Sequence, residues 1–277
     1  MSIYKKEIIN LSSNQLTDNI FKQNIFKGKI IIIKKSAEIL KILETTERYF
    51  HDFFNLNISN PKKRYLEFNH QTHLFFMILQ NRIKNCKRIK KHFTNFLKKF
   101  GFRIEDTFMD YLTFRFSPSL GRKNIGTLVP TAAHRDTWAS NIFNQINFWF
   151  PIHDISNKNS IFLVPKYFDK KVQNNSNTWS FSFYKNKKDY KSTPVTDMFF
   201  QKEEIVSIKL SKGEVLCFSG HHLHGSLLGD KDRLNLETRV VSKNDEKKYE
   251  IPNNLDAMGE IKKKNGLKIS LQEKITI

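Results

Sequence analysis

His134 and Asp136 are the first residues of the chain whose types and spacing could do chemistry. Side chains two positions apart on an extended segment point to the same side, so an imidazole and a carboxylate placed in this way can bind one metal ion. Taken alone, the pair has an equally ordinary interpretation, in which the histidine is hydrogen-bonded to a neighbouring loop. The sequence from His134 to Asn141 also fits the H-R-D-x-x-x-x-N pattern of a protein-kinase catalytic loop. A kinase is excluded, because no glycine lies between Gly126 and Gly213 to form its metal-binding Asp-Phe-Gly segment.

Three further histidines, His221, His222 and His224, follow an apolar strand that begins after a Gly-Glu turn. One of them, added to the first pair, would complete a two-histidine, one-carboxylate set. That set holds non-haem Fe(II) and leaves coordination positions open for a cosubstrate and dioxygen. Because we expect His222 and His224 on the same face of one strand, their spacing does not choose between them.

An anion-binding residue is predicted on the last apolar strand, where Arg233, Asn235, Glu237 and Arg239 alternate and can face the same interior. A guanidinium inside a β-fold is costly unless it meets an anion, and its forked geometry suits a carboxylate. The alternative is an internal ion pair between an arginine and Glu237 or Asp136.

These residues together resemble the phytanoyl-CoA-dioxygenase-like branch of the Fe(II)/2-oxoglutarate oxygenases. The resemblance covers about residues 110 to 242 and includes shorter marks: Gly213-Glu214-x-Leu216-x-Phe218 for the family's G-D-x-L-x-F turn, and Asp154, Asn159-Ser160 and Pro165. It departs from the family at Ser160, which replaces a glycine, and at 166–168, which replace Gly-Ser-His. The segments 134–138 and 144–151 look more narrowly like bacterial members, including those of specialised-metabolite biosynthesis.

The resemblance implies that His134, Asp136 and His224 are the catalytic iron ligands, which favours His224 over His222. It also implies that Arg233, helped by the hydroxyl of Ser226, binds 2-oxoglutarate. Because the interval from His224 to Arg233 is shorter than the family's, Arg239 is a second candidate for that role. The implied cofactors are Fe(2+), 2-oxoglutarate and O2. The implied reaction is hydroxylation or a related oxidation of a small-molecule metabolite, since halogenating members have a small residue in place of Asp136.

The strand that contains Gln145, Asn147 and Trp149 is expected to line the substrate pocket with these three alternating side chains. Ordinary sheet packing is the alternative. The elements that must position the site follow from the apolar spacing. Helices are predicted over 36–54 and 72–100, with Gly101 as a left-handed stop. Short strands are predicted over 111–116, 145–152, 160–164, 205–210, 215–218 and 233–241.

We therefore expect a mainly β protein with flanking helices. The resemblance specifies a double-stranded β-helix, a jelly roll of the cupin type, with an N-terminal helical support. A single oxygenase domain is predicted over 1–277, with helical support at 1–104, the jelly-roll core and metal site at 105–242, and a Lys-rich tail at 243–277. Arg115 and His153 are interpreted as structural or surface residues.

Composition bounds the remaining alternatives. Hydrophobic residues make up 39% and charged residues 27%, which excludes a disordered chain. A net charge of +20 favours a polyanion partner, but lysines are scattered along the whole chain, so the charge alone identifies none. Two other functions remain open: a nucleic-acid demethylase of the alkylation-repair type, from the Arg233–Arg239 spacing, and a non-catalytic metal-binding jelly roll. The expected partner is a small molecule, with some preference for an anion, rather than nucleic acid.

The compartment is predicted from the termini and the cysteines. Cys86 and Cys217 are too few for a disulfide framework. The first ten residues lack an apolar signal sequence, and the longest aliphatic run, 30–33, is too short to span a membrane. We expect a cytoplasmic protein without a membrane span, and the sequence does not indicate an oligomeric state.

Overall fold

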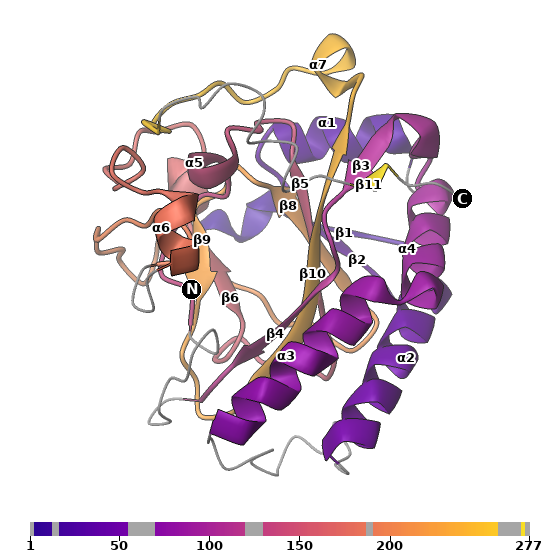
Figure 1. The fold of residues 1–277 in the computed structure, drawn as a ribbon. Helices are drawn as coiled ribbons and strands as arrows, with labels where there is room; N and C mark the ends of the chain where they lie inside the picture. The colour runs from indigo at the N-terminus through magenta and orange to yellow at the C-terminus, as the bar shows by residue number, and fades with distance from the viewer. Residues whose placement is uncertain are drawn as a thin grey trace.

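Two β-sheets form the body of the protein, which the computed structural model describes over residues 3–12, 17–54, 70–119, 130–186, 191–259 and 273–274. The larger sheet has the strand order β1-β2-β8-β5-β10-β3-β11, with β4 also paired to β10 (Figure 1). Its strands are β1 (Ile8–Leu11), β2 (Ile30–Ile33), β3 (Thr107–Met109), β4 (Thr113–Ser117), β5 (Ile146–Pro151), β8 (Val215–Ser219), β10 (Arg233–Ser242) and β11 (Glu273–Lys274). The smaller sheet has the order β7-β6-β9, with β6 (Ile161–Leu163), β7 (Val206–Ser207) and β9 (His224–Ser226).

From β4 to β10 the chain passes back and forth between the two sheets. β4, β5, β8 and β10 belong to the larger sheet, and β6, β7 and β9 to the smaller one. Between β4 and β5, His134 joins the smaller sheet through an antiparallel bridge to His224. This repeated crossing between two sheets is the winding of a jelly roll. The predicted double-stranded β-helix is therefore confirmed, with sheets that stay open among the described residues instead of closing into a barrel.

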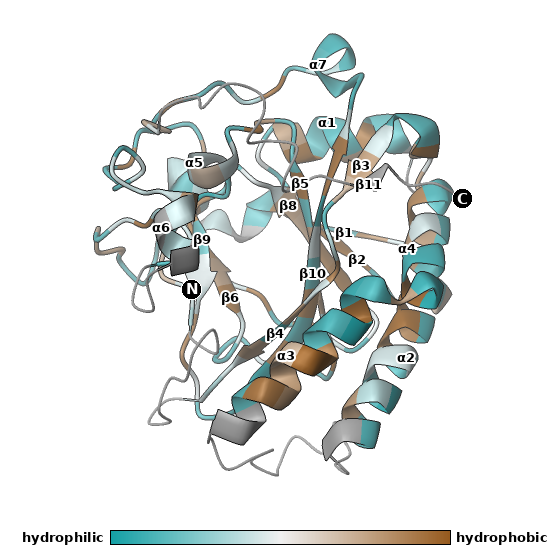
Figure 2. Ribbon diagram, in the orientation of Figure 1, coloured by the Kyte–Doolittle hydropathy of each residue, from teal (hydrophilic) through white to brown (hydrophobic). Residues whose placement is uncertain are grey.

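Helices cover the outer face of the larger sheet with a phenylalanine-rich core (Figures 1 and 2). Phe93 packs against Phe148 of β5, with ring centroids 5.6 Å apart, and Phe76 packs against Phe116 of β4 at 5.0 Å. The α-helices are α1 (Asp18–Phe26), α2 (Ala37–Phe54), α3 (His70–Asn85), α4 (Lys87–Lys99), α5 (Thr137–Ser140), α6 (Phe181–Asn186) and α7 (Asp245–Lys248). Short 3-10 helices span Ile3–Glu7, Ile104–Asp106 and Pro165–Tyr167.

The predicted helix over 36–54 is confirmed by α2, but the single helix over 72–100 is wrong. Cys86 has extended backbone angles, φ −76° and ψ 104°, and separates α3 from α4. The interruption lets α3 pack toward β4 while α4 packs toward β5, so each helix follows its own part of a twisted sheet. The apolar spacing continues across Cys86 and hides the break. Gly101 ends α4 with a left-handed φ of 78°, as predicted.

The N-terminal part contributes strands as well as helices. The isoleucines of β2 are all buried, with Ile31 and Ile33 in the core under the helices and Ile30 and Ile32 in the core between the sheets. A strand covered on both faces reads as a continuous apolar run, which explains this sequence. Within the described ranges, no helix is long and apolar enough to cross a membrane.

The predicted strands are found, with shifted ends. The largest change is at 205–210, where only β7 and an isolated bridge from Leu210 to Ile155 are paired.

Candidate metal centre

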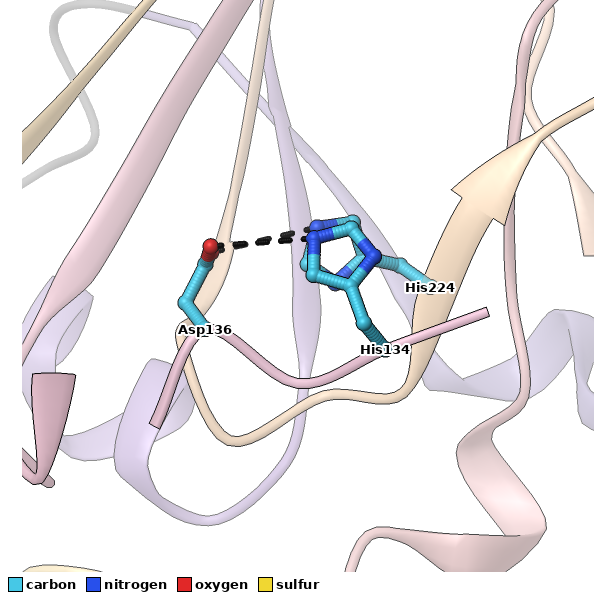
Figure 3. A group of neighbouring side chains, drawn as sticks. All are labelled: His134, Asp136 and His224. Carbon is cyan, nitrogen blue, oxygen red and sulfur yellow. Dashed lines mark ion pairs between the residues drawn. The ribbon is translucent and has the colours of Figure 1, made fainter. Parts of the chain in front are cut away.

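His134, Asp136 and His224 lie together between the two sheets, with the carboxylate facing both imidazole rings (Figure 3). The Nε2 atom of His134 is 3.8 Å from Oδ1 of Asp136, and the Nε2 atom of His224 is 3.8 Å from Oδ2. One donor atom from each residue lies within 4.8 Å of the other two. Two of these residues come from the segment before β5 and the third from the start of β9, so the jelly-roll winding is what brings them together.

The two histidines are held by a reciprocal pair of backbone hydrogen bonds. The amide of His134 donates to the carbonyl of His224, and the amide of His224 donates to the carbonyl of His134, both at 2.9 Å. Residues paired directly in an antiparallel bridge extend their side chains to the same face. Their ring centroids are accordingly 4.2 Å apart.

Backbone carbonyls fix the protonation of both rings. Nδ1 of His134 lies 2.8 Å from the carbonyl of Ala132, and Nδ1 of His224 lies 3.0 Å from the carbonyl of His222. Because a carbonyl oxygen can only accept, each Nδ1 carries a proton, and Nε2 is the ring nitrogen left to bind a metal. Metal-bound histidines are oriented in this way by their other ring nitrogen.

Burial and neighbouring groups shift the pKa values of His134 and Asp136 in the direction that favours binding of a cation. Desolvation lowers the pKa of His134 to about 4, and His224 adds to this effect, so His134 is neutral at neutral pH. Burial alone would raise the pKa of Asp136, but the neighbouring His224 and Arg239, together with the hydrogen bond from Asn147, hold it below its ordinary value. Two imidazole nitrogens and one carboxylate are the donor set of a facial Fe(II) site.

His222 points away from this cluster, which removes the ambiguity left by its spacing from His224. Its Nε2 lies 3.1 Å from the carbonyl of Gly28, and burial lowers its pKa to about 4. The expectation that His222 and His224 share one face of a strand is wrong, because residues 220–222 form a turn and β9 begins only at His224. His221 is also buried, facing Phe168, outside the cluster.

Arg233 is a buried guanidinium held by neutral acceptors. It donates to the carbonyl of Ser160 at 2.6 Å and to the hydroxyl of Ser226 at 3.0 Å, and it stands over the ring of Trp149. Its Nε atom is buried with no partner among the described residues. Desolvation lowers the pKa of Arg233 to about 10. A buried cation with spare donors and no directly bonded carboxylate is the arrangement expected of an anion receptor.

Arg239, the second candidate, already has a carboxylate. One of its terminal nitrogens donates to Oδ2 of Asp110 at 2.8 Å. Glu237 is likewise paired, with the Nε atom of Arg115 at 2.7 Å. Of the carboxylates considered for an internal ion pair, Glu237 forms one, but with Arg115 of β4; Arg239 pairs with Asp110 instead, and Arg233 has no such bond.

A cavity of about 1010 Å³ opens over the cluster, and its lining includes all three candidate ligands together with Ser226, Arg233 and Arg239. Asn147 and Trp149 of β5 also line it. Gln145, just before β5, is buried outside the lining, and its amide donates to Oδ1 of Asn147 at 3.1 Å. Further wall residues come from the segment 176–184, including Trp179, Phe181 and Tyr184.

Arg135, between two candidate ligands, is a residue that sequence reasoning missed. It is fully buried and donates to four backbone carbonyls, those of Tyr167, Phe168, Lys170 and His221. Asp256 lies 3.4 Å from its Nε and also accepts from the Trp138 indole at 2.7 Å. The C-terminal segment thus braces the loop that holds the cluster. The position of Arg135 between two candidate ligands is the only sign of its role in the sequence. Its partners lie too far along the chain to be identified from the sequence.

No family model matches the chain, and no curated protein matches it in sequence. Among solved structures, it is similar to EvdO2 from Micromonospora carbonacea var. aurantiaca in complex with 2-oxoglutarate, with a TM-score of 0.49 and 10% identity over 80% of this chain and 90% of that one. The epimerase SnoN, in complex with Fe3+, alpha ketoglutarate and nogalamycin RO, gives a TM-score of 0.44 and 12% identity over 83% of each chain. EctD from S. alaskensis, in its apoform, gives a TM-score of 0.44 and 11% identity over 89% of this chain and 81% of that one.

Proposed function

We propose that this chain is an Fe(II)- and 2-oxoglutarate-dependent oxygenase that hydroxylates, or otherwise oxidises, a small-molecule metabolite. The observation that carries the proposal is the convergence of two imidazole Nε2 atoms and one carboxylate, those of His134, His224 and Asp136, in one large cavity. Three protein ligands leave open positions for a chelating cosubstrate and dioxygen. Bound together, iron, 2-oxoglutarate and dioxygen supply the oxidation of a substrate C–H bond, with succinate and carbon dioxide as coproducts.

Arg233 is the residue that would bind the carboxylate of 2-oxoglutarate farther from the metal. Its guanidinium is buried, aligned by Ser160 and Ser226, and has an unpartnered Nε. The hydroxyl of Ser226 is itself held by the amide of Thr131 at 3.2 Å, so it is fixed beside the arginine. Arg239 is assigned to the wall of the cavity, because Asp110 already neutralises it.

The substrate proposed for this cavity is a small polar molecule. Two ion pairs, Arg239 with Asp110 and Arg115 with Glu237, present both donors and acceptors to the cavity. An anionic substituent would find Lys84, an exposed cation of the lining. The jelly roll of 105–242 would contain the catalytic residues, with 1–104 as its support, while the tail region contributes Asp256 as a brace.

Two measurements test this function. Anaerobic addition of Fe(II) and 2-oxoglutarate is expected to give a weak visible charge-transfer band, and His134→Ala is expected to abolish it. A succinate-release screen over amino acids, aminocyclitols, acyl-thioesters and nucleosides would then identify the substrate class. Metal binding without a band or any succinate release would favour the non-catalytic jelly roll instead. Turnover on alkylated DNA or RNA, with salt-sensitive binding, would favour the nucleic-acid demethylase.

A further inference from the structure

The carboxylate of Asp136 presents both of its oxygens to the metal cluster. Oδ1 is the oxygen near His134, and Oδ2 is the one near His224, each 3.8 Å from the ring nitrogen. A metal ion bound here could therefore take one oxygen or both. The difference matters for function, because a second oxygen would occupy a position that the cosubstrate or dioxygen needs.

Asn147 distinguishes the two oxygens. Its side-chain Nδ2 donates a short hydrogen bond to Oδ2 of Asp136. A carboxylate oxygen engaged in such a bond has less electron density to offer a cation, so Oδ1 is left as the better metal ligand.

Gln145 fixes the orientation of the Asn147 amide. The Nε2 atom of Gln145 donates to Oδ1 of Asn147 at 3.1 Å. With its oxygen facing Gln145, Asn147 must turn its NH2 group toward the carboxylate. Both amides are buried, with exposed fractions of 1% for Gln145 and 6% for Asn147, so water does not compete freely for these bonds.

Gly220 provides the space that Gln145 occupies. A Cβ atom at this position would lie 2.5 Å from Nε2 of Gln145 and 2.9 Å from its Cδ. The backbone of Gly220 is held on both sides, by the carbonyl of Gln145 at 2.9 Å and the amide of Thr137 at 3.3 Å. The glycine therefore stays close to the amide and only hydrogen fits between them.

We propose that Gly220, Gln145 and Asn147 form a relay that positions Asp136 as a one-oxygen metal ligand and thereby keeps a coordination position open. Asn147 and Gln145 are positioning residues in this scheme, and the relay acts through Asp136 alone. The inference rests on the proposed function, since it assigns the relay to the same metal site.

The test measures Co(II) binding, with 2-oxoglutarate absent, by the visible absorption that Co(II) acquires in a protein site. Loss of a partner that orients a metal ligand typically weakens metal binding about 10- to 100-fold, and we expect this for Asn147→Ala. Gln145→Ala removes one neutral hydrogen bond from the relay and is expected to weaken binding roughly 2- to 10-fold. The shape and intensity of the Co(II) spectrum should change in both variants, because the carboxylate is free to rotate.

Gly220→Ala perturbs the relay without changing any of its polar groups. The atoms that the new methyl group would meet belong to the flexible end of Gln145, so we expect that amide to move and the fold to survive. Co(II) binding should then weaken about as much as in Gln145→Ala, roughly 2- to 10-fold. In the Asn147→Ala background, Gln145→Ala should have no further effect, since Gln145 acts only through Asn147.

Asn144→Ala is the matched control. Asn144 is buried next to Gln145, and its amide donates to the carbonyl of Ser242 at 3.2 Å, outside the relay. This variant should lose stability like the others but bind Co(II) as the wild type does. Wild-type affinity and spectrum in Asn147→Ala, or additive effects of the two amide substitutions, would overturn the relay. A wild-type protein that binds no Co(II) would instead refute the metal site and with it the proposed function.

Discussion

Replacing Arg233 by methionine should separate cosubstrate binding from stability. The guanidinium is 5% exposed and has no directly bonded carboxylate, so it is a buried cation held by two neutral oxygens and the ring of Trp149. Burial lowers its pKa to about 10. With about 1.4 kcal/mol for each tenfold change in an ionisation equilibrium, the folded protein disfavours the charged form by roughly 3 kcal/mol.

The substitution leaves no orphaned acceptor behind. The carbonyl of Ser160 keeps the amide of Leu227 at 2.9 Å, and the hydroxyl of Ser226 keeps the amide of Thr131 at 3.2 Å. Methionine has a similar length and no charge. We therefore expect Arg233→Met to leave the free energy of unfolding unchanged or to raise it, by up to roughly 3 kcal/mol.

Whereas stability is expected to stay the same or rise, the affinity of Arg233→Met for 2-oxoglutarate should fall. Truncating one partner of a buried, hydrogen-bonded charge pair costs about 2–5 kcal/mol, which corresponds to a roughly 30- to 4,000-fold weaker Kd. The assay is an anaerobic titration of the Fe(II) protein with 2-oxoglutarate, followed through the charge-transfer band, beside urea unfolding of the metal-free protein.

Arg239→Met is the matched control for this prediction. It removes the partner of Asp110 and should lower stability while leaving the Kd for 2-oxoglutarate near the wild-type value. If Arg233→Met kept normal affinity and Arg239→Met lost it, the assignment of the two arginines made here would be refuted.

Three further outcomes are expected. His224→Ala should abolish metal binding. His222→Ala removes a buried ring outside the cluster, so it should lower the melting temperature but leave metal binding intact. Loss of Co(II) binding in both variants would contradict this. Burial, with help from Arg135, lowers the pKa of His221 to about 3, so the unfolded chain takes up a proton first and stability falls as the pH drops from 6.5 toward 3. At pH 5 this loss is about 2 kcal/mol for His221, and urea unfolding of His221→Gln at pH 7 and 5 should show a pH dependence smaller by that amount. Asp256→Asn leaves the buried guanidinium of Arg135 without its carboxylate and should cost about 3–5 kcal/mol, which urea unfolding would detect.

The sequence predicts the parts of this protein that depend on local periodicity. Alternating apolar residues identify the strands that wind between the two sheets, and apolar spacing identifies α2 and the region of α3 and α4. The break at Cys86 is not predictable in this way, because one extended residue does not disturb the order of apolar residues on either side of it. The two helices on either side of it pack on different strands, α3 on β4 and α4 on β5, and no local pattern encodes these long-range contacts.

The residues of the site also fall into those that local sequence identifies and those whose role depends on contacts between distant segments. His134, Asp136 and His224 could be found because metal binding demands particular residue types, two of them at a fixed spacing. Gln145 and Asn147 were predicted to line the substrate pocket from their alternation with Trp149, but alternation gives only the face of a strand. The carboxylate of Asp136 lies next to that face. The amide of Asn147 therefore donates to Asp136, and the amide of Gln145 donates to Asn147.

The net charge of +20 comes largely from exposed side chains outside the cavity. The basic residues of α4 alternate with its buried side and are exposed on the helix surface, as in Lys87, Arg88 and Lys91. Inside the cavity, by contrast, Arg239 and Arg115 are paired with carboxylates. A diffuse surface charge of this kind attracts any anion at long range and is screened by salt, but it does not select one. Selection of a substrate therefore has to come from the fixed groups of the cavity. If so, added salt should lower kcat/KM for anionic substrates without changing which substrate is preferred.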